Sequence, residues 1–395
     1  MQGLMQQWPL LCHKIIDHAA RQHGAREIVS RSVEGPIVRT TYREARERAL
    51  KVAQRLSRDG YKRGDRIGTL AWNTARHLEA WYGIMGMGGV YHTLNPRLFP
   101  DQIAWIMNHA EDRCLFVDLT FMPLVEKIAP SVPSLEKVIV LTDAAHMPQT
   151  ALPNVVAYEE WLAEADGDFA WVETDENEAC GMCYTSGTTG DPKGVVYSHR
   201  SNVLHAMIAC MPDAMGISSR DVILPVVPMF HANAWGLPFA CPAVGAKLVL
   251  PGRYADGASL ARFIANESVT IAVGVPTVWL GLMDHLDANG IELPSLKRIM
   301  VGGAPMSQAL MDRIEQRGIE VQTTWGMTEL SPLGTATPPG AEARDPRTSG
   351  RPAVGVDLRL TDDEGNPLDV QREVEGHLWV RGAAVVDRYF GQEQL

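Results

Sequence analysis

The chain has 395 residues, a formal net charge of −11, 46% hydrophobic residues and 21% charged residues. This composition is typical of a globular protein of two or three domains with a large core. An acidic chain has no broad positive field, which argues against nucleic acid or an anionic membrane as a partner. There is no 18-residue apolar run and no basic, apolar leader, so we expect a cytoplasmic protein without a membrane span.

The first part of the chain alternates between strand and helix patterns. Thr41 to Glu44 forms a capping box, which predicts a helix that begins there and ends near Asp59 and Gly60. Buried strands are expected at 66–72, 114–118 and 138–141, and helices at 75–86 and after Pro100. This alternation predicts a parallel α/β sheet. Residues 144–177 are more polar and are interpreted as a connection with one short helix.

The alternation resumes after residue 176 and changes after about residue 340. Strands are expected at 221–227, 246–250, 270–275, 297–301 and 319–324, and helices at 259–266 and 307–317. Residues 356–381 read as antiparallel strands around turns. We therefore expect an α/β fold with two stacked, mostly parallel sheets, at 1–175 and 176–340, and a small antiparallel β subdomain at 341–395.

Six cysteines are present, and Cys180 and Cys183 match a Cys-x-x-Cys pattern. No second pair and no His-x3-His accompanies them, so structural cysteines in a buried strand are favoured over metal or redox use. Few cysteines, mostly in apolar runs, are typical of a reducing compartment.

A glycine-rich loop at 184–194 follows one of the strand-like runs. Glycines let backbone N–H groups converge on an anion, hydroxyls add donors, and Lys193 adds a positive charge. The spacing matches neither a Walker loop nor the dinucleotide fingerprint. A simple turn is the alternative for such a segment, but its lysine and preceding strand favour phosphate binding. The candidate phosphate ligands are Thr185, Ser186, Gly187, Thr188, Thr189, Gly190 and Lys193.

Three further segments follow predicted strands: 228–236, 301–305 and 323–329. In open α/β sheets, ligands bind beyond the carboxyl ends of the strands. We therefore expect these segments and the glycine-rich loop to meet in one site.

At these motifs the chain resembles the adenylate-forming enzymes, which include acyl-CoA synthetases, luciferases and nonribosomal adenylation domains. Thr185 to Lys193 resembles their AMP-binding signature, and Trp325 to Glu329 resembles their Tyr-Gly-x-Thr-Glu motif. Gly303 to Pro305 resembles their adenine loop. Residues 375–382 and 389–391 resemble the motif that closes the large domain. The resemblance covers nearly the whole chain, and it is strongest to bacterial medium-chain acyl-CoA and methylmercaptopropionate-CoA ligases.

The resemblance implies two half-reactions. A carboxylate attacks the α-phosphate of Mg-ATP to give an acyl-adenylate and pyrophosphate, and a thiol, usually that of CoA, then attacks the adenylate. ATP, Mg²⁺, CoA and a small carboxylic acid are therefore the expected ligands. Glu329 offers the hard oxygen that Mg²⁺ prefers. The implied catalytic residues are Thr185, Thr328 and Glu329, and the implied adenine contacts are Gly303, Ala304, Pro305, Thr324, Trp325, Gly326 and Met327.

The acyl or pantetheine pocket is expected at His231, Trp235, Gly302 and Gly303. His231 resembles the family's gating histidine, although a core histidine is its commoner role. Trp235 comes four residues later and is predicted to lie on the same helical face. Bulky Trp235 and Trp325 favour short- or medium-chain acids, with aryl acids as an alternative. Asn233 is the nearest polar candidate for reading an amine, which disfavours amino acids.

The resemblance also implies a mobile C-terminal domain, which carries a lysine for the reacting carboxylate and which this chain lacks. The family's Thr-Gly-Asp motif is missing as well. We therefore expect the large N-terminal domain of a longer synthetase, with severely impaired adenylation because an electrostatic contact is lost. The alternatives are an acyl-AMP ligase that delivers to a carrier protein and a non-catalytic nucleotide- or acyl-binding module. A homodimer stays open as an assembly.

Overall fold

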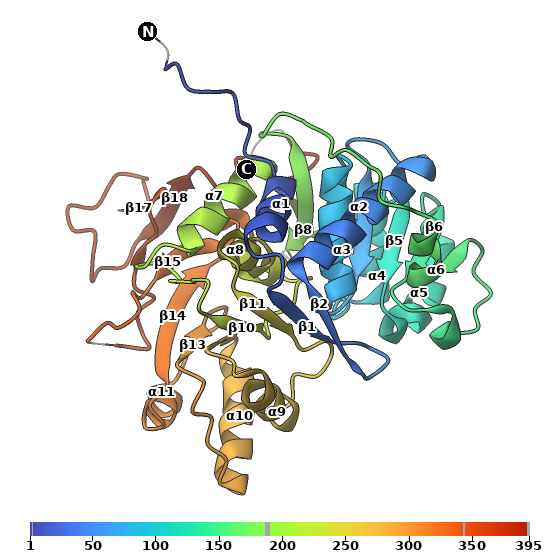
Figure 1. Cartoon of the computed structure of the whole chain (residues 1–395). Coiled ribbons are helices and arrows are strands. Elements are labelled where there is room, and N and C mark those ends of the chain that lie inside the picture. Colours follow the sequence, from blue (N-terminus) through green and yellow to red (C-terminus); the bar gives the residue numbers. More distant parts are fainter. Residues whose placement is uncertain (2, 186–189, 343, 393–395) are drawn as a thin grey trace.

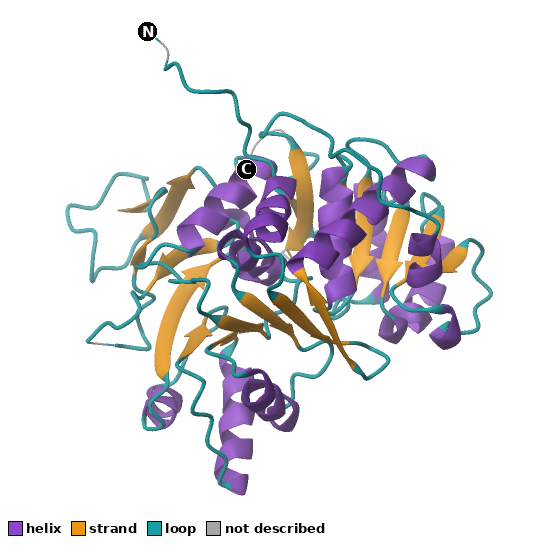
Figure 2. Cartoon of the chain, viewed as in Figure 1, coloured by secondary structure: helices purple, strands orange, loops and turns teal. Residues whose placement is uncertain are grey.

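Two large sheets and one small antiparallel sheet form the fold in the computed structural model, which describes residues 1, 3–185, 190–342 and 344–392 (Figures 1 and 2). The first sheet has seven strands in the order β7 (Val155–Ala157), β6 (Lys137–Val140), β5 (Cys114–Val117), β3 (Arg66–Leu70), β4 (Val90–Thr93), β8 (Ala179–Thr185) and β9 (Lys193–Ser198). All its pairs are parallel except β8 with β9.

The second sheet has nine strands and is parallel in its centre. Its order is β16 (Arg351–Pro352), β15 (Leu333–Ala336), β14 (Glu320–Gly326), β13 (Arg298–Val301), β12 (Ile271–Gly274), β10 (Val222–Pro225), β11 (Lys247–Leu250), β1 (Glu27–Arg31) and β2 (Ile37–Thr41). The small sheet pairs β17 (Val356–Thr361) with β18 (His377–Gly382). The predicted α/β class, with two mostly parallel sheets and a small antiparallel one, is confirmed.

Helices fill the space between the large sheets and cover their outer faces (Figure 1). The inner helices are α1 (His13–Gln22), α2 (Tyr42–Arg58), α3 (Ala75–Gly86), α6 (Tyr158–Ala163), α7 (His199–Ala209) and α8 (Leu237–Val244). One continuous core joins them to the inner faces of both sheets. The outer helices are α4 (Pro100–Ala110) and α5 (Met122–Ile128) on the first sheet, and α9 (Gly257–Glu267), α10 (Pro276–Asn289) and α11 (Gln308–Glu315) on the second.

Local signals placed several elements correctly. Helix α2 begins at the predicted capping box, where the Glu44 N–H donates to Thr41 Oγ1 and the Thr41 N–H donates to the Glu44 carboxylate. Strand order does not follow chain order, however. The N-terminal hairpin β1–β2 joins the second sheet, and β8 and β9 join the first. Strands from both sides of residue 175 therefore contribute to each sheet, and the domain boundaries stay a prediction.

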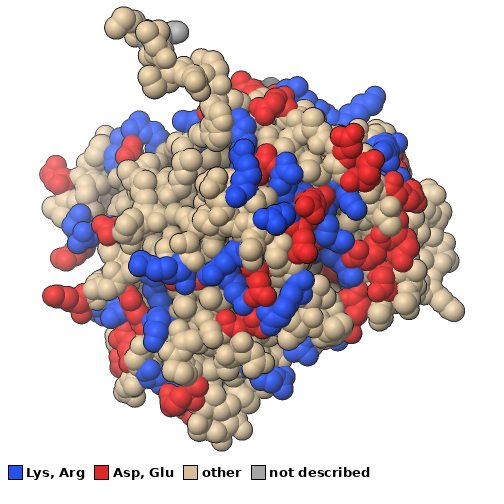
Figure 3. Space-filling view, viewed as in Figure 1, with Lys and Arg blue, Asp and Glu red and all other residues tan. Residues whose placement is uncertain are grey.

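The surface carries both signs of charge. Figure 3 shows Lys and Arg side chains interspersed with Asp and Glu on one face of the molecule, and neither sign forms a continuous field there. Among the helices that the structure describes, none has the length and apolar character that crossing a membrane requires.

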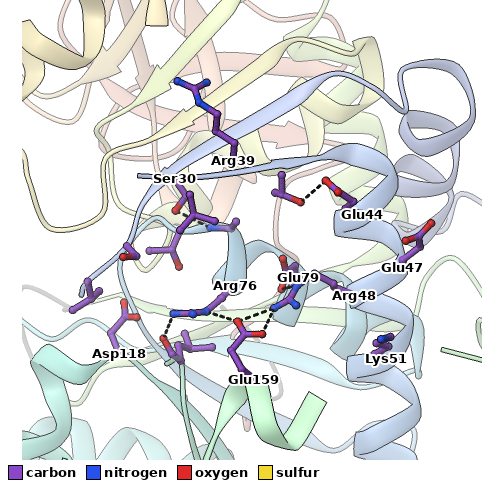
Figure 4. Close-up of a pocket in the computed structure, with 17 residues that line it drawn as sticks. Ser30, Arg39, Glu44, Glu47, Arg48, Lys51, Arg76, Glu79, Asp118 and Glu159 are labelled. Atoms are coloured by element: carbon purple, nitrogen blue, oxygen red, sulfur yellow. Dashed lines mark hydrogen bonds and ion pairs between the residues drawn. The ribbon is translucent and has the colours of Figure 1, made fainter. Parts of the chain in front are cut away.

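A polar cavity of about 370 Å³ lies where the β1–β2 hairpin meets α2, α3 and the ends of β5 and β6 (Figure 4). Its arginines are engaged by carboxylates of the protein. Arg48 pairs with Glu79 at 2.9 Å and with Glu159 at 3.0 Å, and Arg76 pairs with Glu159 at 2.7 Å. Since Glu79 is buried, removal of Arg48 would leave the Glu79 carboxylate without its cation. This network joins α2, α3 and α6.

Asp118 lies at the end of β5 in the same cavity and is 1% exposed. Its Oδ2 accepts a hydrogen bond of 2.6 Å from the Trp72 N–H. Burial raises the pKa of Asp118 from its ordinary value near 3.8 to about 7. An unfolded chain would ionise this carboxyl near pH 4, whereas the folded chain keeps it protonated up to about pH 7. The free energy of unfolding therefore falls as the pH rises through this range.

We predict that Asp118→Asn stabilises the protein, and that its advantage over the wild type grows from pH 4.5 to pH 8. The amide still accepts from Trp72 but has no charge to bury. At about 1.4 kcal/mol per pKa unit, the gain at pH 8 has an upper bound of about 4 kcal/mol. Urea unfolding midpoints at both pH values measure it, with exposed Asp213→Asn as the control. An equal change at both pH values would contradict the assignment.

Candidate functional site

A cavity of about 510 Å³ opens where the ends of β8 and β14 face each other. It brings together most of the residues predicted for the site. The predicted residues that line it are Thr185, Lys193, His231, Trp235, Gly303, Thr324, Trp325, Gly326, Met327, Thr328 and Glu329. Gly190, Gly302, Ala304 and Pro305 are described but are not among the lining residues. Ser186, Gly187, Thr188 and Thr189 lie outside the described residues.

Several lining residues were not predicted: Asn95, Leu98, Tyr184, Met215, Ala232, Pro332, Leu333 and Tyr389. Asn95 and Leu98 follow β4, a strand that was not predicted from the sequence, so the rule that ligands bind beyond strand ends could not be applied to them. Tyr184 is the last residue before Thr185, and its Oη lies 2.6 Å from His109 Nδ1. The remaining residues belong to loops, to the 3₁₀ turn at Ala232–Gly236 and to the start of β15 at Leu333, and their position at the cavity depends on tertiary packing.

The glycine-rich loop connects β8 to β9, an antiparallel pair. Thr185 ends β8 and lies opposite Lys193, which begins β9. This register places a hydroxyl and an ammonium side by side at the cavity. The Lys193 ammonium also lies 5.0 Å from the centre of the Tyr389 ring, within the range of a cation–π interaction.

The Thr-Glu motif forms the 3₁₀ turn η5 (Thr328–Leu330) after β14. The Tyr197 hydroxyl on β9 donates to the Thr328 carbonyl at 2.9 Å, and the Tyr389 hydroxyl donates to Glu329 Oε1 at 2.8 Å. Glu329 lines the cavity beside the hydroxyls of Thr185 and Thr328. A carboxylate among oxygen donors suits a hard cation such as Mg²⁺, so this donor set fits the metal that the motif implies.

Trp235 forms one wall of the cavity and packs closely on the loop after β13. A Cβ at Gly302 would lie 3.0 Å from Trp235 Cη2 and 2.6 Å from Thr324 Oγ1. Thr324 Oγ1 is itself held by its hydrogen bond to the Val301 carbonyl at 3.1 Å. The absence of a side chain at Gly302 therefore lets the indole approach the backbone.

The right-handed helical face predicted for His231 and Trp235 is wrong. Ala232, Asn233, Ala234 and Trp235 all have positive φ, between 44° and 55°, and form a left-handed turn. Such a backbone costs about 1–2 kcal/mol per residue. The buried Asn233 Nδ2 donates to the Tyr91 hydroxyl at 2.9 Å and helps to fix the turn. Asn233 thus faces the core and does not line the cavity.

His231 lies at the mouth of the cavity with an exposed edge. The surrounding protein desolvates the ring and the positive charge of Arg97 acts on it, and both lower the imidazole pKa below its usual value. The lowered pKa favours the neutral ring, which can donate or accept a hydrogen bond without adding charge to the cavity.

Cys180 and Cys183 do not converge. Cys183 packs in a small cluster with Val195 and Tyr197, whereas Cys180 lies in the main core with its Sγ 3.8 Å from that of Cys12. His199 completes a buried group of three donor side chains within 4.8 Å of one another. The Cys12 N–H already donates to His199 Nδ1 at 3.1 Å, so this contact joins the N-terminal segment to α7.

Comparison with known proteins decides the family. The model of the AMP-binding enzyme family matches residues 16–390. The chain belongs to this family. It is 45% identical over 400 residues to the medium-chain-fatty-acid–CoA ligase of Ectopseudomonas oleovorans, covering 99% of this chain and 73% of that protein. It is 44% identical to the 3-methylmercaptopropionyl-CoA ligase of Ruegeria lacuscaerulensis, covering 99% of this chain and 74% of that protein.

A solved structure shares the fold. The N-terminal domain of FACL13 from Mycobacterium tuberculosis superposes with a TM-score of 0.83 at 24% identity, covering 97% of this chain and 91% of that one. The family match and the relatives make the chain an AMP-forming acid–thiol ligase, and the acyl-CoA ligases of this family use ATP, Mg²⁺ and CoA.

We predict that Gly302→Ala destabilises the protein by about 1–3 kcal/mol, because the added Cβ overlaps Thr324 Oγ1 and pushes the Trp235 indole. The control is Gly281→Ala, since Gly281 lies in α10 with nothing within 4 Å of a Cβ there. That change is expected to stabilise by about 0.5–1 kcal/mol. Chemical denaturation measures both. Equal stabilities of the two variants would show that the packing around Gly302 relaxes freely.

Proposed function

We propose that this AMP-binding enzyme activates a short- or medium-chain carboxylic acid as an acyl-adenylate and transfers the acyl group to CoA. The observation that carries the proposal is the single cavity that Lys193 and Glu329 line at one side and Trp235 at another. Phosphate-binding groups, a metal-binding carboxylate and an apolar wall therefore surround one space. This is what a reaction between a nucleotide and an acyl carboxylate needs.

At the nucleotide side, we assign Thr185, Thr328 and Lys193 to the phosphates and Glu329 to the magnesium ion. Bound Mg²⁺ supplies charge neutralisation at the phosphate oxygens. Trp325 and the loop at Gly303 would border the adenine, together with exposed Met327. These residues act by positioning: the acid's oxygen attacks the α-phosphorus, the bond to the bridging oxygen breaks, and pyrophosphate leaves with that electron pair.

At the acyl side, we assign Trp235, which lines the cavity, to the wall of the acyl pocket. Nucleotide and acid must share about 510 Å³, which favours a small acid. The names of the Ectopseudomonas and Ruegeria relatives support the same size class. The amino-acid alternative stays disfavoured, because Asn233 is committed to Tyr91. Aryl acids, and a carrier protein in place of CoA, remain as alternatives.

We also propose that residues 1–395 alone bind ATP and acid but form the adenylate slowly. Of the described residues that line the cavity, Lys193 is the one with a permanent positive charge, and it lies opposite Thr185 at the phosphate loop. The lysine that the family resemblance assigns to the reacting carboxylate has no candidate among them. A missing contact of this kind removes transition-state stabilisation of about 3–4 kcal/mol, which is roughly 10²–10³ in rate.

Acid-dependent ATP–pyrophosphate exchange tests the proposed substrate class. We expect exchange to be faster with hexanoate, octanoate and 3-methylmercaptopropionate than with palmitate, benzoate or amino acids. Single-turnover formation of acyl-CoA then compares free CoA with a phosphopantetheinylated carrier protein. Exchange driven best by benzoate or palmitate would overturn the size argument. Exchange at more than about 10 s⁻¹, an ordinary enzyme rate, would contradict the slow adenylation.

We predict that Glu329→Gln weakens the binding of Mg-ATP by about 10–100-fold while metal-free ATP binds as before, since the amide keeps the shape but loses the charged ligand. Calorimetric titrations with and without Mg²⁺ measure the difference. Glu126→Gln, on the exposed face of α5, is the matched control. Unchanged Mg²⁺ dependence in Glu329→Gln would remove this residue from the metal site.

A further inference from the structure

Residues 384–390 form a segment, here called the closing segment, that ties the two phosphate-side elements of the cavity together. The Val386 N–H donates to the Glu329 carbonyl at 2.8 Å, and the Ser331 hydroxyl donates to the Ala384 carbonyl at 2.7 Å. At its other end, the Phe390 N–H donates to the Gly194 carbonyl at 2.8 Å. The closing segment thus bonds to the Thr-Glu turn on one sheet and to β9 on the other.

Packing holds the end of this segment in place. The Phe390 ring meets His109 of α4 edge to face, with ring centres 5.4 Å apart. Val386 and Tyr389 pack on the small cluster of Cys183, Val195 and Tyr197 beneath the β8–β9 hairpin. The position of Tyr389 is therefore fixed by neighbours on both sides, independently of any ligand.

Tyr389 contacts both charged residues of the cavity. Its hydroxyl donates to Glu329 Oε1 at 2.8 Å, and its ring lies 5.0 Å from the Lys193 ammonium. Burial, with the Glu329 charge adding to it, raises the pKa of Tyr389 to about 12. The hydroxyl keeps its proton at neutral pH and acts as a donor. It engages one of the two carboxylate oxygens of Glu329, so the other can face the cavity.

We propose that Tyr389 is a positioning residue that orients the Glu329 carboxylate for Mg²⁺ and steadies Lys193 beside it. This inference rests on the proposed role of Glu329 as the metal ligand. A glutamate side chain has three rotatable torsions, and immobilising it when the metal arrives costs entropy. The hydrogen bond from Tyr389 already restricts the Glu329 side chain in the folded protein, so less entropy is lost when the metal binds. Partners of this kind behind a metal ligand typically change metal affinity by about 10–100-fold.

The phenylalanine variant separates the hydroxyl from the ring. In Tyr389→Phe the bond to Glu329 is lost, while the ring stays against Lys193 and the cluster below. We therefore expect Mg-ATP to bind about 10-fold more weakly and metal-free ATP to bind within about 2-fold of the wild type. A merely structural tyrosine would change both affinities together or neither. The matched control is Tyr254→Phe. The Tyr254 ring packs against the Arg31 guanidinium and does not line the cavity.

Calorimetric titration of Mg-ATP, Mn-ATP and metal-free ATP into residues 1–395 measures these affinities without requiring turnover. The series is the wild type, Tyr389→Phe, Glu329→Gln, the double variant and Tyr254→Phe, with thermal unfolding as a check on each fold. We expect the Tyr389→Phe effect to vanish in the Glu329→Gln background, because the two residues act through one carboxylate.

The outcomes separate the two claims. If Glu329→Gln loses the metal-dependent affinity and Tyr389→Phe matches the wild type or binds Mg-ATP more tightly, the positioning role is wrong and the proposed function stands. If Glu329→Gln itself leaves Mg²⁺ dependence unchanged, the metal assignment fails first. If the losses of the two variants add fully in the double variant, Tyr389 acts on the nucleotide by a route other than Glu329, which also overturns the inference.

Discussion

The hydrogen bond from the Tyr197 hydroxyl to the Thr328 carbonyl joins the two large sheets at the site. Tyr197 lies on β9 of the first sheet and is 3% exposed, and Thr328 follows β14 of the second. Burial keeps the pKa of Tyr197 far above neutrality, so its hydroxyl remains a donor. A buried donor left without a partner costs about 1–3 kcal/mol, so relative sliding of the sheets here is opposed. The relative position of the glycine-rich loop and the Thr-Glu turn depends on this registration.

Packing between the two sheets also fixes their relative position. Helices α2, α3, α7 and α8 pack between them into one continuous core, and the Arg48–Glu79 pair closes the polar cavity near the β1–β2 hairpin. Trp81 and Tyr91 stack with ring centres 4.3 Å apart within this core. Tyr91 then reaches Asn233 and fixes the left-handed turn that carries Trp235. The position of Trp235, the proposed wall of the acyl pocket, is thus set by core packing as well as by its own loop.

The sequence predicted the elements and motifs better than their assembly. The α2 capping box, the strand and helix alternation and the Thr-Glu motif are encoded within a few neighbouring residues. The β1–β2 hairpin is different, because Ile28 pairs with Leu248, far along the chain, and no local pattern specifies that partner. The left-handed turn at Ala232–Trp235 contradicts local backbone preference, since Ala and Trp rarely adopt positive φ, and the core bond from Asn233 to Tyr91 helps to hold it. Tyr389 belongs to a recognised motif, yet its contact with Glu329 depends on the packing of β9 against the closing segment.

The balance of charge in the cavity links the contacts of Lys193 and Glu329 to the proposed binding of a nucleotide. The chain as a whole is acidic, with a net charge of −11, and would repel a polyphosphate. Among the described lining residues, Lys193 contributes a positive charge and Glu329 a negative one, so the protein side of the cavity is close to neutral. A nucleotide triphosphate therefore needs a cation that it brings with it, and in its proposed role Glu329 helps binding only when its carboxylate faces that cation. A carboxylate left free to turn toward the phosphates would instead oppose binding. In the proposed arrangement, orientation of Glu329 by the closing segment thus decides whether this acidic group favours or disfavours binding of the substrate.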